Sequence, residues 1–237
     1  NLLQSKTTPQ PVKDQLSLVS KNTNRLLKMV NQILDFQKME QSPLKVSKVE
    51  IASFVENIYG NYIKNAEIKR IDYNFENRAG IQMVWIDTDA VEKIIVNLLS
   101  NAFKYTPPGR TIRVSVYNEN SEVSVRIKDT GIGISKDKQE RLFRRFESFN
   151  EDKSKPSTGI GLSIVKELAD RHGAKILVES EEKSGSSFTI VFKKGTAHFG
   201  SDVTIDDSPQ SWRLSDTQVE PGDAGKSAFV YDEIGNH

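Results

Sequence analysis

Three polar side chains recur at the spacing of one helix face. Asn97, Asn101 and Lys104 stand at i, i+4 and i+7, so a helix carries all three on one side. Tyr105 lies four residues after Asn101. An amide oxygen is a hard ligand of the kind that Mg²⁺ accepts, and a lysine ammonium attracts phosphate oxygens. The segment therefore suits a phosphate chain with its metal ion, although a solvated polar helix face has the same pattern when it is considered alone.

A carboxylate and two glycines follow at the end of an expected strand. Asp129, Gly131 and Gly133 come directly after the alternating segment Val123–Lys128. A carboxylate at a strand end can accept a hydrogen bond from the amino group of a purine, and glycines let the backbone approach a flat ring closely. The alternative is a tight turn that the aspartate caps.

Two further segments combine positive charge with glycines. The helix expected at Lys136–Phe146 contains Arg145 and leads into the polar segment Ser148–Thr158, which could close over an anion. Gly159 and Gly161 then open another expected helix, and backbone N–H groups at a helix N-terminus form a phosphate site. Each also has a plainer explanation, since the first could be an ordinary surface loop and a Gly-x-Gly at a helix start is weak support by itself.

Composition excludes several other kinds of site. The chain of 237 residues has no cysteine, which rules out disulfides, thiolate zinc sites and cysteine catalysis. A net charge of +1 argues against bulk nucleic-acid binding, and no apolar run is long enough to span a membrane. There is no Walker-type phosphate loop, and Lys136 and Ile164 stand where a dinucleotide fingerprint needs its third glycine.

Hydrophobic periodicity indicates the elements that would position these residues. Helices are expected at Ile51–Ala66, Thr88–Lys104, Lys136–Phe146 and Gly161–Arg171. Strands are expected at Ile71–Glu76, Ile81–Ile86, Thr111–Tyr117, Val123–Lys128, Lys175–Glu179 and Phe188–Lys193. Several strands alternate between apolar and polar residues, which favours an α+β fold. We expect a two-layer α/β sandwich whose mixed, mostly antiparallel sheet has helices on one side.

The flanking regions differ in composition. Lys13–Gln41 contains no glycine or proline and carries a long apolar stripe, so we expect an amphipathic helix. It would pack either on its own domain or in a bundle completed by another chain or by a missing segment. Strong periodicity stops at Thr196, and eight acidic but only two basic residues follow from Gly200 onward, which indicates a flexible acidic linker or tail. The chain starts at Asn1 rather than at Met, as a piece of a longer protein does. The expected domains are residues 1–42, 43–195 and 196–237.

The order of the four polar segments resembles the ATP-binding catalytic domain of sensor histidine kinases, in a wider family shared with DNA gyrase, a heat-shock chaperone and a mismatch-repair ATPase. The family's N box, first glycine box, F box and second glycine box would be Asn97–Tyr105, Asp129–Gly133, Leu142–Phe146 and Thr158–Leu162. The helix Lys13–Gln41 resembles the second helix of the dimerisation domain in hybrid two-component sensors.

The resemblance implies a role for each residue of the first two segments. Asn101 would bind Mg²⁺, with Asn97 beside it. Lys104 would contact phosphate, and Tyr105 would line the nucleotide pocket. Asp129 would accept a hydrogen bond from the amino group of adenine.

The other segments would complete an ATP site. Gly131 and Gly133 would shape the adenine pocket, and Arg145 would approach the γ-phosphate. The second glycine box would hold the phosphate chain through Thr158, Gly159, Gly161 and Leu162. The residues with an implied catalytic role are Asn97, Lys104 and Arg145.

The implied activity is transfer of the γ-phosphoryl group of ATP to a histidine on a dimerisation helix that is absent from this sequence. The phosphoryl group would then pass to an aspartate of a response-regulator receiver domain. The intact protein would be a homodimer, and this region would be the cytoplasmic portion of a membrane-anchored sensor, without membrane contact of its own. Two alternatives are a nucleotide-gated binding module without phosphotransfer and a serine-directed relative such as an anti-sigma kinase.

Some residues depart from the family pattern. Ser157 stands where many relatives have glycine. Asn97 stands where the gyrase and chaperone relatives have a glutamate that activates water, which predicts weak ATP hydrolysis. The three histidines are His172, His198 and His237, and none has the context of a phosphoacceptor, so the chain alone is not expected to phosphorylate itself. His172 stands at a helix end, where a cation is favoured by the helix dipole and would be structural.

Overall fold

The computed structural model describes residues 42–147 and 159–207. Nearer the N-terminus it describes only residues 12, 15, 16, 19, 20, 23, 26, 27, 30 and 34, all of them helical. The rest of the expected helix Lys13–Gln41 lies outside the described residues, as do 148–158 and 208–237, so that helix and the flexible tail stay predictions. The contacts of the chain divide it into two units, and the larger unit contains all the described strands.

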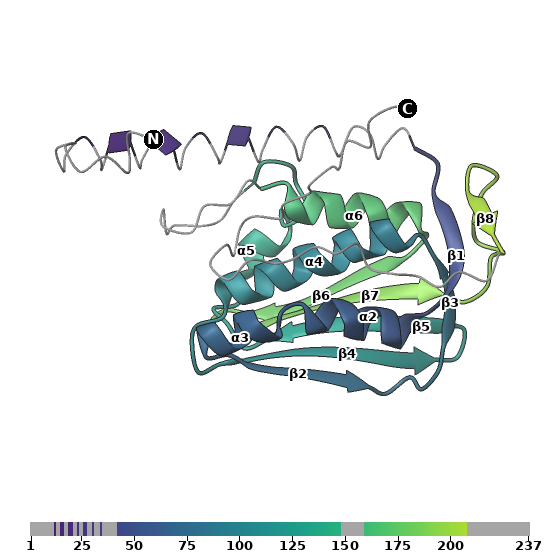
Figure 1. Cartoon of the computed structure of the whole chain (residues 1–237), viewed down its shortest axis with the longest axis horizontal. Coiled ribbons are helices and arrows are strands. Elements are labelled where there is room, and N and C mark those ends of the chain that lie inside the picture. The colour runs from purple at the N-terminus through teal and green to yellow at the C-terminus, as the bar shows by residue number, and fades with distance from the viewer. Residues whose placement is uncertain are drawn as a thin grey trace, which may run out of the picture. The chain divides into compact units, whose positions relative to one another are not determined.

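A five-stranded mixed sheet forms one layer of this unit (Figure 1). Its strands lie in the order β2 (Asp72–Asn77), β4 (Thr111–Glu119), β5 (Glu122–Asp129), β7 (Gly185–Lys193) and β6 (Lys175–Glu181). β2 runs parallel to β4, and the other three neighbouring pairs are antiparallel. The mixed, mostly antiparallel sheet is therefore confirmed.

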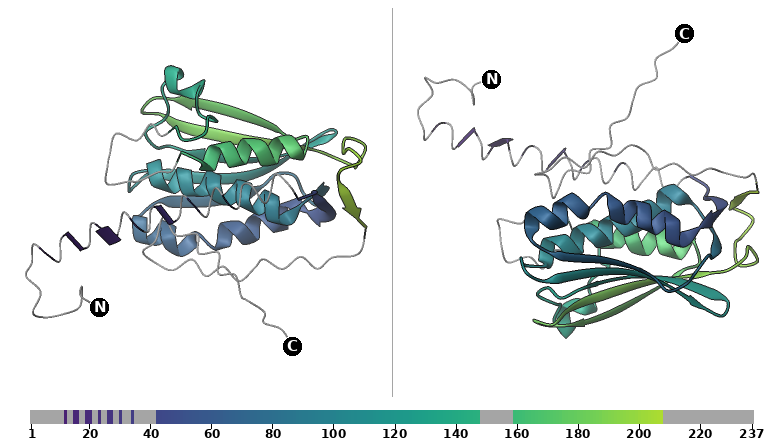
Figure 2. Two further views of the ribbon diagram at one scale, coloured as in Figure 1. Left: turned by 90° about the horizontal axis from the view of Figure 1, so that it is seen from above. Right: turned by 60° about the horizontal axis from the view of Figure 1, so that its bottom comes forward.

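Helices form the second layer and cover one face of this sheet (Figure 2). They are α2 (Ile51–Gly60), α3 (Ile63–Lys69), α4 (Thr88–Tyr105) and α6 (Gly161–Arg171). Sheet residues such as Ile112, Val125 and Ile190 are buried. Burying an apolar side chain of this size stabilises the fold by about 1.5–3 kcal/mol. The two-layer sandwich is therefore confirmed. Separately, among the described residues no helix has the length and apolar character needed to cross a membrane.

A second, three-stranded sheet was not expected. β1 (Lys45–Glu50) pairs antiparallel with β3 (Met83–Ile86) and parallel with β8 (Thr204–Asp206). β8 is only three residues long and lies in a segment whose serines, aspartates and glycines indicated a linker. Pairing with a distant strand decides its conformation, so the folded unit extends past the boundary that composition placed at residue 195.

Two expected helices are wrong in extent. The segment Ile51–Ala66 contains the end of one helix and the start of another. α2 ends at Gly60, where the N–H of Asn61 donates to the carbonyl oxygen of Ile58 at 3.2 Å, and α3 begins at Ile63. The helix expected at Lys136–Phe146 is a single turn, α5 (Lys136–Gln139). Phe146 has a φ of +64°, which an α-helix does not allow, and its N–H donates to the carbonyl of Gly159 at 2.9 Å. A contact between segments therefore overrides the local pattern.

His172 at the end of α6 is structural but not cationic. Its side chain is buried, its Nε2 accepts the backbone N–H of Asp87 at 3.2 Å, and its Nδ1 lies 2.7 Å from the carbonyl oxygen of Leu168. A backbone N–H can only donate, so Nε2 carries no hydrogen and Nδ1–H donates to Leu168. The ring is therefore the neutral Nδ1–H tautomer, and the cation suggested by the sequence is wrong.

Acidification is expected to destabilise the fold through His172. Burial lowers the pKa of His172 below its ordinary value of 6.5. Between the pKa of His172 in the unfolded chain, 6.5, and its lower pKa in the folded protein, the unfolded chain binds more protons than the folded one. The contribution of His172 to the free energy of unfolding is therefore complete above pH 6.5 and is lost as the pH falls through the folded pKa. Urea unfolding from about pH 7.5 to 5 should show a steeper loss for the wild type than for His172→Gln. Parallel pH curves for the two proteins contradict this assignment.

Candidate functional site

Helix α4 separates an apolar face from a polar one. Its buried stripe contains Val91, Ile95, Leu98, Leu99 and Ala102, as the sequence predicted. Asn97, Asn101 and Lys104 are half-buried on the other side. The Nδ2 of Asn97 donates to the carbonyl oxygen of Lys93 at 2.8 Å, which leaves its Oδ1 directed away from its own helix. The expected row of polar groups therefore exists on one helix face.

The start of α6 lies against Asn97, the first residue of this row. A Cβ placed on Gly161 would come within 2.7 Å of Asn97 Oδ1. Any residue larger than glycine must therefore displace the Asn97 side chain. The N-terminal turn of α6, whose first backbone N–H groups have no partner within the helix itself, is brought to the polar face of α4.

The loop that follows β5 lies against the end of α4. The N–H of Ile132 donates to the carbonyl oxygen of Tyr105 at 3.2 Å. A Cβ on Gly131 would clash with that same carbonyl, so only glycine allows this approach. The Asp129–Gly133 loop and the start of α6 therefore contact the same helix, the first at Tyr105 and the second at Asn97.

Asp129 is a buried carboxylate at the edge of this loop. It is 6% exposed, and its Oδ1 accepts the N–H of Gly131 at 2.8 Å. Burial raises the pKa of Asp129, while the backbone N–H groups of Gly131 and Ser186 act in the opposite direction. A carboxylate has about four acceptor positions, so one that accepts from these two N–H groups can still accept from an amino group.

Two glycines hold the β6–β7 turn against the same loop. Gly133, with a φ of +67°, has no room for a Cβ beside the carbonyl of Glu181. Gly185, with a φ of +110°, has none beside the carbonyl of Asp129. The N–H of Lys183 completes the contact by donating to Ile132 O at 2.7 Å. The sequence identified Gly133 but not this packing role, because the turn it contacts lies far away along the chain.

The F-box segment reaches the second glycine segment through its backbone. A Cβ on Gly159 would lie 2.6 Å from the carbonyl carbon of Phe146, and Gly159 has a φ of +70°. Arg145 is exposed. Thr158 lies outside the described residues, so its expected role stays a prediction. At the other end, the Nζ of Lys104 stands 5.2 Å from the centre of the Tyr105 ring.

The polar face of α4 could hold a metal ion only together with a ligand. Among the described residues, no group of three or more histidine, cysteine, aspartate or glutamate side chains is placed to bind one. Mg²⁺ at phosphate sites is commonly held by one or two protein oxygens together with phosphate oxygens and water. The half-buried amide of Asn101 fits that kind of site.

The segments that meet on α4 coincide with a known sequence family. Residues 86–196 match the family described as histidine kinase-, DNA gyrase B-, and HSP90-like ATPase. This part of the chain is an ATPase domain of that family. The match begins at the last residue of β3 and ends just after β7, so β1 and β8 lie outside it.

The curated relatives of this ATPase domain are histidine kinases. The chain is 29% identical over 212 residues to histidine kinase P4 of Formosa agariphila. The aligned region covers 86% of this chain and 16% of the relative. It is 32% identical over 193 residues to sensor protein SrrB of Staphylococcus aureus. That aligned region covers 79% of this chain and 33% of the relative. The chain thus spans between about a sixth and a third of the length of these relatives.

Solved structures of histidine kinases share the fold of the ATPase domain. Full-length ShkA in complex with AMPPNP matches with a TM-score of 0.66 and 21% identity, over 83% of this chain and 42% of that one. Histidine kinase ThkA in complex with response regulator protein TrrA matches with a TM-score of 0.65 and 21% identity, over 82% of this chain and 55% of that one. These likenesses confirm the α+β fold class.

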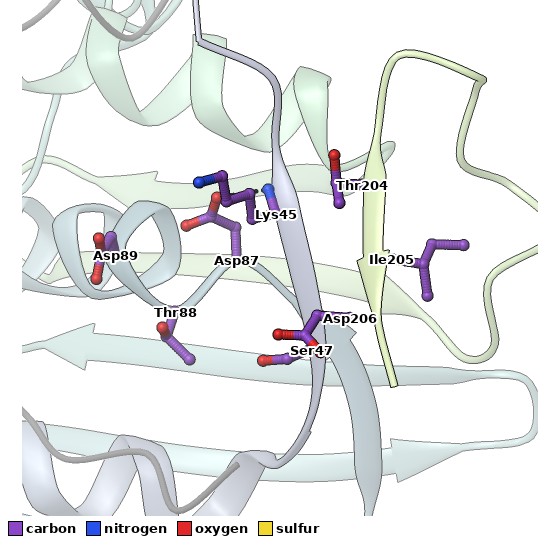
Figure 3. Close-up of a pocket in the computed structure, with 8 residues that line it drawn as sticks. All are labelled: Lys45, Ser47, Asp87, Thr88, Asp89, Thr204, Ile205 and Asp206. Atoms are coloured by element: carbon purple, nitrogen blue, oxygen red, sulfur yellow. Dashed lines mark hydrogen bonds between the residues drawn. The ribbon is translucent and has the colours of Figure 1, made fainter. Parts of the chain in front are cut away.

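A cavity of about 530 Å³ lies at the opposite end of α4 from Tyr105. Its lining residues are Lys45, Ser47, Asp87, Thr88, Asp89, Thr204, Ile205 and Asp206 (Figure 3). The sequence singled out none of them. Asp87 is the N-cap of α4, and one of its carboxylate oxygens accepts the N–H of Lys45 at 3.0 Å. This end of the ATPase domain therefore joins the first strand to the helix that carries the polar row.

Proposed function

We propose that the chain is the ATP-binding kinase core of a two-component sensor histidine kinase. The observation that carries the proposal is the double contact of α4, with Gly161 at Asn97 and with the Asp129–Gly133 loop at Tyr105. One helix face thus spans from a helix N-terminus, which attracts phosphate, to a buried carboxylate, which accepts from an amino group. An adenine nucleotide carries these two kinds of group at its two ends.

In this proposal the residues act through position and charge. Asp129 accepts the amino group of adenine, and backbone N–H groups at the start of α6 donate to the phosphate chain. Lys104 and Arg145 offset the negative charge of the phosphoryl oxygens. Asn101 would hold Mg²⁺, which would supply further charge neutralisation when bound. The bond from the γ-phosphorus to the bridging oxygen breaks as a bond to an imidazole nitrogen forms, in line.

Asn97 favours transfer over hydrolysis. A carboxylate at this position could accept a proton from an attacking water, whereas the carboxamide of Asn97 has no basic group for that task. Its Nδ2 is already engaged with Lys93. We therefore expect ATP to be hydrolysed slowly in the absence of an acceptor.

We further propose that the acceptor histidine lies on a dimerisation helix outside this sequence, in a homodimeric sensor. His172 is unsuited to the role because it is buried and both of its ring nitrogens are hydrogen-bonded. The relative ThkA was solved with a response regulator, which supports a receiver domain as the next acceptor. The AMPPNP complex of ShkA supports an adenine nucleotide as the ligand. On this proposal the region is the cytoplasmic portion of a membrane-anchored sensor.

Radiolabelled ATP tests the proposed activity. The chain is incubated with γ-labelled ATP and Mg²⁺, alone and with a separate dimerisation domain that carries an acceptor histidine. We expect an acid-labile, alkali-stable label on the added domain only. If this chain becomes labelled when it is incubated without the added domain, the proposal that the acceptor histidine lies outside this sequence is overturned. Tight ATP binding without transfer to any added domain favours the alternative, a nucleotide-gated binding module.

Gly161→Ala is expected to separate stability from nucleotide binding. The atom that a Cβ would meet is the end of the Asn97 side chain, which can rotate away, so the midpoint of thermal unfolding should change little. The displaced Asn97 should weaken ATP binding roughly tenfold. Gly60→Ala is the matched control, because a Cβ there meets nothing within 4 Å. If calorimetric titration finds that Gly161→Ala binds ATP as tightly as the wild type, the proposal that Asn97 lies beside the phosphate chain of ATP is contradicted.

A further inference from the structure

Helices α4 and α6 run antiparallel and are tied to each other at two places. At one place Gly161, the first residue of α6, lies against Asn97 in the middle of α4. At the other, His172 just after α6 accepts the N–H of Asp87 just before α4. A displacement at the His172 end can therefore be carried to the contact of Gly161 with Asn97, because a helix moves as a rigid element.

Asp87 joins three elements at this second place. Its Oδ1 accepts the N–H of Ala90 in the first turn of α4, and its Oδ2 accepts the N–H of Lys45 at the start of β1, each at 3.0 Å. Its own backbone N–H donates to His172 Nε2. The ends of β1, α4 and α6 are therefore fixed to one another through one residue, and only the link to α6 passes through a titratable ring.

We propose that His172 is a positioning residue whose neutral ring, by accepting from Asp87, sets the approach of α6 to α4 that full nucleotide affinity requires. This inference rests on the proposed function. The expected consequence is that acidification weakens ATP binding. A proton on Nε2 would direct an N–H at the N–H of Asp87, so the link would be lost and the end of α6 would move away from the start of α4.

The charged groups around His172 come from three elements. The Asp87 carboxylate at the start of α4 favours the protonated ring, whereas Arg171 on its own helix and His198, in the segment after β7, disfavour it. Burial lowers the pKa of His198, and the charge of Lys193 at the end of β7 lowers that pKa further. Burial outweighs the attraction to Asp87, and the pKa of His172 is lowered.

Two substitutions distinguish positioning from mere packing. His172→Asn keeps a donor near the place of Nδ1, facing Leu168, but its side chain ends short of Asp87. His172→Gln is longer and can place an amide oxygen near the position of Nε2, where it accepts from Asp87. Ile190→Ala is the control for lost stability, because Ile190 is buried in β7 and belongs to neither link.

Hydrogen exchange and calorimetry give two independent readouts. The first is the exchange of the Ile164 amide without nucleotide, since this N–H bonds the carbonyl of Ile160 in the first turn of α6. The second is the dissociation constant of AMPPNP with Mg²⁺ at about pH 8 and at a pH below the midpoint at which the His172 ring titrates in the folded protein, a midpoint that the NMR signal of the ring gives. We expect His172→Asn to speed the exchange and to weaken AMPPNP binding roughly tenfold at the higher pH. His172→Gln should restore both and remove the pH dependence.

Each outcome decides between positioning and packing. Equal effects of His172→Asn and His172→Gln, or of His172→Asn and Ile190→Ala, overturn the positioning role. A wild-type affinity that is the same at both pH values overturns the requirement for a neutral ring. If the wild type binds no AMPPNP, the proposed function fails, and the exchange of Ile164 alone decides whether His172 positions α6.

Discussion

Replacing Asp129 by alanine is expected to weaken ATP binding about tenfold or more, equivalent to about 1.5–3 kcal/mol. Asp129 is 6% exposed, and one of its oxygens is used by the N–H of Gly131. Its other oxygen would accept the amino group of adenine in a site with little water. A charge-assisted hydrogen bond of this kind is among the stronger single contacts that a protein makes to a neutral ring. Isothermal titration of the wild type and the variant measures the loss.

Asp129→Asn is the sharper variant because it changes one function of the side chain and keeps another. Its amide oxygen can still accept the N–H of Gly131, so the loop and the stability of the fold should be largely retained. Its NH₂ group would face the amino group of adenine, donor against donor, and ATP affinity should fall. The same NH₂ group could donate to the ring oxygen of guanine, so the preference for ATP over GTP should narrow. Wild-type ATP affinity in both variants contradicts the adenine contact.

The helix that carries the site could be predicted from the sequence because its information is local. The apolar positions Val91, Ile95 and Leu99 repeat at helical spacing and are buried, so the polar positions between and after them had to lie on the other side of the helix. Asn97 and Asn101 then share a face by geometry alone. What the sequence could not give is which segments approach that face, because the contacts of Asn97 with Gly161 and of Tyr105 with Ile132 join residues far apart in the chain.

Segments fixed by distant partners were the ones predicted poorly. β8 has three residues and two exposed positions, so it has no periodicity to detect, and its conformation comes from pairing with β1. Phe146 carries an apolar side chain at helical spacing from Leu142, yet its N–H bonds Gly159 and its φ is +64°. His172 was recognised as structural, but its charge state depends on the N–H of Asp87, which the sequence cannot place beside it. In each case the deciding contact is long-range.

Gly185→Ala is expected to cost about 3–5 kcal/mol of folding free energy, the largest effect of any single substitution considered for stability. Gly185 opens β7 with a φ of +110°, a conformation open almost only to glycine. A Cβ there would also clash with the carbonyl oxygen of Asp129, a main-chain atom that is held in the ladder between β5 and β7. Neither obstacle can be relieved by rotating a side chain, so the backbone of the turn or of Asp129 must shift.

Gly80→Ala is the control for a positive φ without a close contact, because Gly80 has a φ of +67° but nothing within 4 Å of an added Cβ. The free energy of unfolding of that variant, measured with urea, should fall by only about 1–2 kcal/mol, which is the cost of the left-handed conformation itself. The excess loss of folding free energy in Gly185→Ala would then measure the contact with Asp129 together with the added strain of a φ of +110°, which alanine adopts less readily than +67°. If Gly185→Ala remains folded, its ATP affinity should fall as well, because the Asp129 carboxylate is carried by the backbone that has to move. Equal losses of stability in the two variants would mean that the approach of Gly185 to Asp129 is loose, and that the β6–β7 turn does not support the carboxylate.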